Sequence, residues 1–190
     1  MMKRRTVLSS LTALGVAGIV GRDCAAEGAA ARKDAAVNPA VGAREPKIEL
    51  VYECDVTLSD PQSFGVTAEG QRRIIPITGG TFQGPELKGR VLSGGADWNL
   101  LRTDGVHSVE AAYYLRTDDG VILRIVNKGV GGGGQREDPD SGERFFMFTT
   151  PSFEAPTGKY DWMNRTTFVA TLGARRNARN AVLIRVYKLV

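Results

Sequence analysis

The stretch IELVYECDV, residues 48–56, decides the fold class. Its apolar side chains, at Ile48, Leu50, Tyr52, Cys54 and Val56, alternate with the other residues, which is the period of a strand with one buried face. Further strand-like segments follow at short intervals: 72–78, 89–92, 98–102, 108–116, 121–127, 145–150, 165–172 and 181–189. No segment has a helical period longer than about three turns. The chain is therefore predicted to be all-β.

Two Asp-Gly pairs predict how the strands connect. Asp104-Gly105 and Asp119-Gly120 stand between strand-like runs, and Asp-Gly favours the type I′ turn of a hairpin because both central residues need a positive φ. Two hairpins in succession predict an up-and-down meander. About eight to ten short strands fit a closed barrel or a sandwich. A small barrel is either filled by side chains or leaves room for one small ligand.

Several longer segments are specific enough to compare with known families. In chain order they are RRIIPITGGTFQGP (72–85), GRVLSGGADW (89–98), YLRTDDG (114–120), TTPSFE (149–154) and YDWMN (160–164). Together they resemble the domain-of-unknown-function family 3237, also called uncharacterised protein family 0311, over residues 48–190. The resemblance implies a single antiparallel, lipocalin-like (calycin-like) β-barrel. It implies no general activity.

The first thirty residues have the features of a secretory signal. Lys3, Arg4 and Arg5 precede an apolar run over residues 7–20, and small residues follow. The segment RRTVL (4–8) resembles the twin-arginine export motif, and an ordinary Sec signal with two basic residues is the alternative.

Three segments of the chain are expected. Residues 1–30 form the signal peptide, 31–46 an Ala-rich flexible linker and 47–190 the barrel domain. We expect a bacterial protein that is periplasmic or secreted, with no membrane association once the signal is removed.

Composition excludes several classes of function. Without residues 1–30, which hold four basic and two acidic residues, the net charge falls from +4 to +2, and no stripe of Lys and Arg with interleaved aromatics remains. A nucleic-acid partner is therefore not expected. His107 is the only histidine and follows an Asp-Gly turn, so it is predicted to be exposed, and neither a metal site nor a Ser-His-Asp triad is predicted. No dinucleotide motif is present, and no cofactor is predicted. Cys54 is interpreted as a buried thiol.

Asp97 and Trp98 form the first candidate site. A carboxylate beside a large aromatic ring can act as a general acid or base if the ring shields it from water. The alternative is a turn Asp that accepts backbone hydrogen bonds, with Trp98 filling the barrel.

Glu110 belongs to a strand with two different faces. Glu110, Tyr114 and Arg116 share one face with Ala112, whereas Val109, Ala111, Tyr113 and Leu115 share the other. If the polar face lines a cavity, Glu110 is a second candidate catalytic residue, and Tyr114 and Arg116 are candidate ligand-binding residues. If it faces solvent, they are surface residues, and the sequence leaves both possibilities open.

Asn127, Trp162 and Asn164 are further candidates, predicted at strand ends. They could orient a small organic ligand by hydrogen bonds and stacking, or they could cap strands. With Asp97, Trp98, Glu110 and Tyr114, Asn127 and Trp162 are predicted to lie at or near the wall of one cavity.

Three classes of function remain at this point. The first is a cofactor-independent isomerase, lyase, cyclase or hydratase that uses a carboxylate. The second is a non-catalytic carrier or sensor of a small, aromatic molecule. The third is an assembly partner whose barrel is filled. An open cavity with a buried carboxylate favours the first, an apolar cavity the second and a filled barrel the third.

Overall fold

The computed structural model describes residues 44–132, 136–137, 144–174 and 180–190. The predicted signal, and the linker as far as residue 43, lie outside these ranges. The elements are β1 (Ile48–Leu58), β2 (Gln62–Thr67), β3 (Gly70–Gln83), β4 (Gly89–Val91), β5 (Ala96–Arg102), β6 (Val106–Thr117), β7 (Ile122–Gly132), β8 (Arg136–Glu137), β9 (Arg144–Glu154), the 3₁₀ helix η1 (Asp161–Arg165), β10 (Phe168–Ala174) and β11 (Ala181–Leu189).

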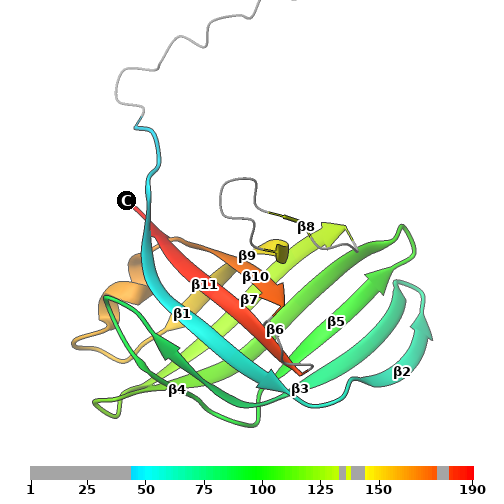
Figure 1. The fold of residues 1–190 in the computed structure, drawn as a ribbon, viewed down its shortest axis with the longest axis horizontal. Coiled ribbons are helices and arrows are strands. Elements are labelled where there is room, and N and C mark those ends of the chain that lie inside the picture. The colour runs from blue at the N-terminus through cyan, green and yellow to red at the C-terminus, as the bar shows by residue number, and fades with distance from the viewer. Residues whose placement is uncertain (1–43, 133–135, 138–143, 175–179) are drawn as a thin grey trace, which may run out of the picture. The chain divides into compact units, whose positions relative to one another are not determined.

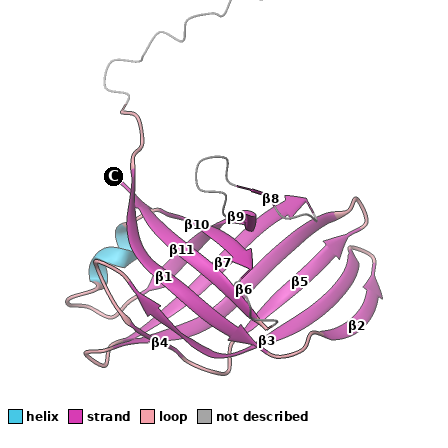
Figure 2. Cartoon of the chain, viewed as in Figure 1, coloured by secondary structure: helices cyan, strands magenta, loops and turns pink. Residues whose placement is uncertain are grey.

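The strands close into one antiparallel, eight-stranded barrel (Figure 1, Figure 2). Around the barrel β1 is followed by β11, β10, β9, β7 and β6, and the pairing of β3 with β1 closes the ring. The short β4 and β5 share one position, because both pair with β3 on one side and β6 on the other. The predicted barrel and its up-and-down connections are confirmed, and the sandwich is excluded.

Both predicted Asp-Gly hairpins are present. Gly105 joins β5 to β6 with φ 81°, and Gly120 joins β6 to β7 with φ 88°, a conformation that glycine adopts without steric cost. Three elements were not predicted from the sequence. The first is β2, whose side chains are almost all exposed, Phe64 and Val66 included. The second is the two-residue β8, and the third is η1.

Gly79 and Gly80 let β3 change partners. The first half of β3 pairs with β2 and β5, and its second half pairs with β1 and β4. At this change Gly79 and Gly80 have φ of 148° and 141°, and a Cβ on Gly80 would lie 2.0 Å from the carbonyl oxygen of Asp55. Only glycine allows β1 to approach β3 this closely.

Aromatic and apolar side chains fill the end of the barrel that carries η1. Figure 1 shows η1, the short orange helix, at the end opposite to β2. Phe168 packs edge-on against Phe153 with ring centroids 4.8 Å apart, and Met163 of η1 is 1 % exposed. Cys54 is buried in the same core, which confirms the predicted buried thiol, and burial raises the pKa of this thiol. Among the described residues, no helix has the length and apolar character needed to cross a membrane.

Candidate functional site

A cavity of about 300 Å³ lies inside the barrel, toward the end that carries the β5–β6 turn. One side of its wall is apolar and comes mainly from β1, β10 and β11, with Val56, Leu58, Leu172, Val182 and Ile184. The other side comes from β3, β5, β6 and β7 and carries the polar side chains that the described residues contribute: Arg73, Asp97, Asn99, His107, Tyr113 and Asn127. The cavity contradicts the alternative of a filled barrel.

Strand register places these polar groups at three levels. Arg73 is paired with Asn99 at the outer level. Two residues deeper, Asp97 is paired with Ala111, which is in turn paired with Asn127. Tyr113 stands two residues beyond Ala111, at the innermost level. Because a strand rises about 3.3 Å per residue, each level is separated from the next by about 7 Å, and Asp97 lies midway between Arg73 and Tyr113.

A chain of hydrogen bonds holds the Asp97 carboxylate in the wall. Arg73 Nε donates to Asn99 Oδ1 at 2.8 Å, and Asn99 Nδ2 donates to Asp97 Oδ2 at 3.4 Å. The backbone N–H of Glu110 donates to Asp97 Oδ1 at 3.0 Å. Burial raises the pKa of Asp97 above its usual range, although these bonds and the charge of Arg73 oppose the rise. Asp97 is therefore a carboxyl group that binds a proton more readily than an exposed one.

Two buried polar atoms at the cavity wall have no protein partner in the described part of the chain. They are the hydroxyl of Tyr113, which is 2 % exposed, and Oδ1 of Asn127, which is 3 % exposed. A buried polar atom left unpaired costs about 1–3 kcal/mol, so a hydrogen bond to either atom would relieve this cost. Burial also raises the pKa of Tyr113 well above its ordinary value, so its hydroxyl keeps its proton.

Gly95 allows the close packing of the chain before β5 against Tyr113. Gly95 precedes β5 and lies against Tyr113, so that a Cβ on Gly95 would come within 2.5 Å of the tyrosine Cβ. The glycine therefore lets the chain before β5 approach β6 at the innermost level of the cavity.

The model of a family described as "Protein of unknown function (DUF3237)" matches residues 46–189. The chain belongs to the DUF3237 family. A UPF0311 protein of Rhodopseudomonas palustris is 33% identical over 147 residues, which are 73% of this chain and 95% of the relative. The crystal structure of a beta-barrel like protein from Acinetobacter baumannii AYE superposes with a TM-score of 0.68 and 34% identity, over 78% of this chain and 98% of the other. These comparisons confirm the resemblance found in the sequence.

A more distant relative is fungal. The hydroalkoxylation enzyme of Penicillium herquei is 22% identical over 130 residues, which are 67% of this chain and 76% of the relative. The crystal structure of an enzyme from the same organism superposes with a TM-score of 0.60 and 20% identity, over 78% of this chain and 99% of the other. At this identity the superposition shows a shared fold.

In this DUF3237 protein the cavity brings together two of the eight residues predicted from the sequence. Asp97 and Asn127 lie in the wall, within one row of paired residues. The expected position at the cavity is wrong for Glu110, Trp98 and Tyr114. Each is an odd number of residues from an inward neighbour and therefore faces outward.

Solvent exposure confirms the outward orientation of these three side chains. Glu110 forms an ion pair with Lys128 at 3.0 Å, its side chain 52% exposed, and Trp98 and Tyr114 are 42% and 48% exposed. For the β6 face that the sequence left open, the side with Val109, Ala111 and Tyr113 is the inward one.

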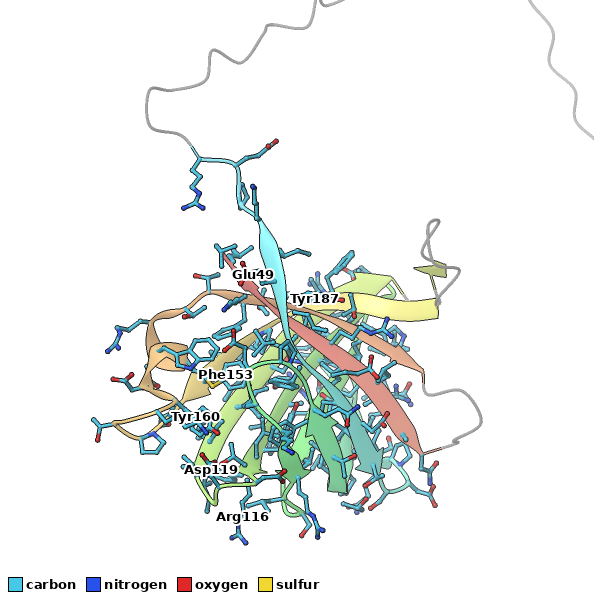
Figure 3. The ribbon with its side chains drawn as sticks, turned by 60° about the vertical axis from the view of Figure 1, so that its left-hand side comes forward. Glu49, Arg116, Asp119, Phe153, Tyr160 and Tyr187 are labelled. Atoms are coloured by element: carbon cyan, nitrogen blue, oxygen red, sulfur yellow. The ribbon has the colours of Figure 1, made fainter. Side chains whose placement is uncertain are left out.

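The other three predicted residues also lie away from the cavity. Arg116 is exposed on the outer face of β6, and Figure 3 shows it at the outside of the barrel. Trp162 and Asn164 lie in η1 rather than at strand ends. Trp162 packs near Phe168, with ring centroids 6.0 Å apart. The Asn164 side chain accepts a hydrogen bond from the backbone N–H of Ala155 at 2.8 Å and donates one to its carbonyl oxygen at 2.9 Å. These bonds hold the local backbone and do not face the cavity.

Sequence reasoning missed four polar residues of the wall. Arg73, Asn99 and Tyr113 were not singled out, and His107 was predicted to be exposed, whereas it is partly buried and lines the cavity. Parity could have found two of them, because His107 and Tyr113 share the face of Val109 and Ala111. Nothing in the sequence marks Arg73 as inward and its neighbour Arg72 as outward. No cluster of three potential metal ligands occurs among the described residues.

Proposed function

We propose that this protein is a cofactor-independent enzyme that binds a small organic molecule in the barrel, with Asp97 as the general acid and base. The observation that carries the proposal is the Asp97 carboxyl group in the cavity wall, held by the N–H of Glu110 and by Asn99, with unpaired polar atoms of Tyr113 and Asn127 nearby. A carboxyl group can give a proton and take it back, and the burial that raises the pKa of Asp97 favours its protonated form.

The reaction class that suits these groups is addition to, or elimination from, a carbon–carbon double bond. In the addition, protonated Asp97 gives its proton to one alkene carbon while a hydroxyl oxygen bonds to the other carbon. The proton of that hydroxyl then returns to Asp97, so no redox partner is needed. Tyr113 and Asn127 would hold a substrate oxygen by hydrogen bonds. The fungal relative is a hydroalkoxylation enzyme, and hydroalkoxylation is chemistry of this class, which supports the proposal.

The test uses 2-prenylphenol, which carries a phenol and an alkene and can close to a cyclic ether. The full-length protein is incubated with it in deuterated water, and the product is measured by mass spectrometry. The wild type should form the ether with deuterium on carbon. Asp97→Asn should lose about 10²–10⁴-fold of the rate, the usual contribution of general acid–base catalysis. Glu110→Gln is the matched control, because this carboxylate faces solvent, and it should retain the rate.

A non-catalytic binding protein is the second candidate, and the apolar half of the wall favours it. In that case 2-prenylphenol binds without turnover. Asp97→Asn then changes only the affinity, while filling the cavity by Ala111→Phe abolishes binding. Turnover that is equal in wild type and Asp97→Asn would refute the role given to Asp97.

We also propose export through the twin-arginine pathway to the periplasm or medium, with 31–46 as the linker. The support is the segment RRTVL (4–8) ahead of the apolar run. Changing both Arg4 and Arg5 to lysine should leave precursor in the cytoplasm in a cell-fractionation assay. Arg22→Lys, outside the motif, is the control and should be exported normally. Unchanged export of the double variant would identify an ordinary Sec signal.

A further inference from the structure

Arg73 lies at the outer level of the cavity. Among the described residues, no carboxylate forms an ion pair with its guanidinium group. Its Nε is bound to the amide oxygen of Asn99. In the part of the chain that the structure describes, its two Nη atoms make no hydrogen bond or ion pair. Since a guanidinium group carries five N–H donors, most of its capacity for hydrogen bonds remains available beside the cavity.

The neighbouring Arg72 shows the contrast. Its side chain lies on the opposite face of β3 and forms an ion pair with Glu69. The two arginines therefore differ in their surroundings. Arg72 pairs with a protein carboxylate outside the barrel, whereas Arg73 is joined to Asp97 by hydrogen bonds through the amide of Asn99 and acts on it directly only through its charge.

The inner level of the cavity has a different polarity. The Tyr113 hydroxyl and Asn127 Oδ1 are neutral, buried and unpaired. Between the two levels, the wall formed by β1, β10 and β11 is apolar. Arg73 and Tyr113 are separated by two levels, about 13 Å along the strands, with Asp97 between them. A molecule that reaches both levels presents its middle to Asp97.

We propose that the ligand of this cavity is an amphipathic carboxylate. Its carboxylate pairs with Arg73, its apolar body lies against β10 and β11, and a hydroxyl accepts a hydrogen bond from Tyr113 and donates one to Asn127 Oδ1. This inference rests on the proposed binding of a small molecule in the barrel and adds the charge and the orientation of that molecule. A bidentate carboxylate–guanidinium pair is strong and directional, so Arg73 would select the acid over neutral analogues.

The test compares 4-hydroxy-3-prenylbenzoate with its carboxamide by isothermal titration calorimetry near neutral pH. The acid should bind the wild type about tenfold more tightly than the amide, a difference expected for one partly exposed charge-assisted pair. Arg72→Gln is the matched control and should keep this ratio. Arg73→Gln should reduce the ratio to about one, and Arg73→Lys, which keeps the charge, should retain part of it.

A third probe tests the inner level. 3-Prenylbenzoate, which lacks the phenol, should bind the wild type several-fold more weakly than the hydroxylated acid, and Tyr113→Phe should remove this difference. Equal affinity for acid and amide in the wild type, or an unchanged ratio in Arg73→Gln, overturns the carboxylate proposal. If Tyr113→Phe still weakens the binding of both the hydroxylated acid and its carboxamide in that case, the proposed function stands. Absence of saturable binding for every probe overturns both.

Discussion

At the η1 end of the barrel side chains fill the interior, whereas toward the β2 end the same sheet leaves about 300 Å³ unfilled. The filled end is aromatic: Phe168 contacts Phe153 and Trp162. There the Tyr160 hydroxyl donates to Asp119 at 3.0 Å, and Figure 3 shows both residues at this end. The open end instead holds Tyr113 and Asn127 atoms without protein partners. This comparison indicates that the packed η1 end provides stability for the barrel, so the other end can hold a cavity.

The largest expected effect is at the filled end. Phe168→Ala removes a ring that is 2 % exposed and should lower the free energy of unfolding by about 3–5 kcal/mol, because a cavity forms among packed rings. Ile75→Ala at the cavity wall should cost no more than about 2 kcal/mol, since this side chain already borders open space. Urea denaturation of both variants measures the difference, and equal losses would contradict the division between the two ends.

Two tyrosine hydroxyls sharpen the comparison. Tyr113→Phe removes an unpaired buried hydroxyl and should raise the free energy of unfolding by about 1 kcal/mol while weakening ligand binding. Tyr160→Phe removes a hydroxyl that is bound to Asp119 and should lower it by about 1 kcal/mol. Thermal unfolding in the absence of ligand measures both changes. Shifts of the same sign would show that the Tyr113 hydroxyl is not an unpaired group.

Asp97 should make the open end sensitive to pH. Burial raises the pKa of Asp97 from its ordinary 3.8, so the folded protein holds this proton more tightly than the unfolded chain. Its contribution to stability is complete below pH 3.8 and is lost as pH rises through the folded-state value. Asp97→Asn should therefore gain stability relative to wild type as pH rises, measured by urea denaturation at several pH values. If the difference in unfolding free energy between Asp97→Asn and wild type does not change with pH, the pKa of Asp97 is not raised.

Asp119 should show the opposite trend at the filled end, with the smallest effect. The hydrogen bond from Lys159 is the main cause that lowers the pKa of Asp119 from 3.8 to about 2. The stability that this pair provides is present above pH 3.8 and is lost as pH falls toward 2. Asp119→Asn should be less stable than wild type at neutral pH and should become equal to it only as pH falls below about 2. The loss is small because both side chains are exposed, and acid titration of unfolding measures it.

Much of the fold could be predicted from local patterns. Alternation in the stretch 48–56 predicted β1, and the Asp-Gly pairs predicted the turns at Gly105 and Gly120. The strand β2 could not be predicted, because it is held by pairing with β3 while its side chains face solvent. The helix η1 has five residues, too few for a helical period to be recognised.

The candidate site could be predicted only in part. Asp97 and Asn127 were found from residue type alone, and both line the cavity. Glu110 and Tyr114 were misplaced because a period of two defines two faces without saying which is inward. For β6, the face with Val109 and Leu115 is the more hydrophobic one, but a cavity lined by the charged face with Glu110 and Arg116 was an equally weighted alternative.

By itself the sequence determined the class of structure, the order of most strands and the family, because alternation and turn chemistry act over a few residues. Tertiary structure alone decided that Tyr113 and not Tyr114 faces the cavity, and that Arg73 and not Arg72 lies beside Asp97. The physical reason is barrel closure. Pairing β3 with β1 brings residues from β3, β5, β6 and β7 around one interior, and which face becomes that interior depends on the burial of every strand at once.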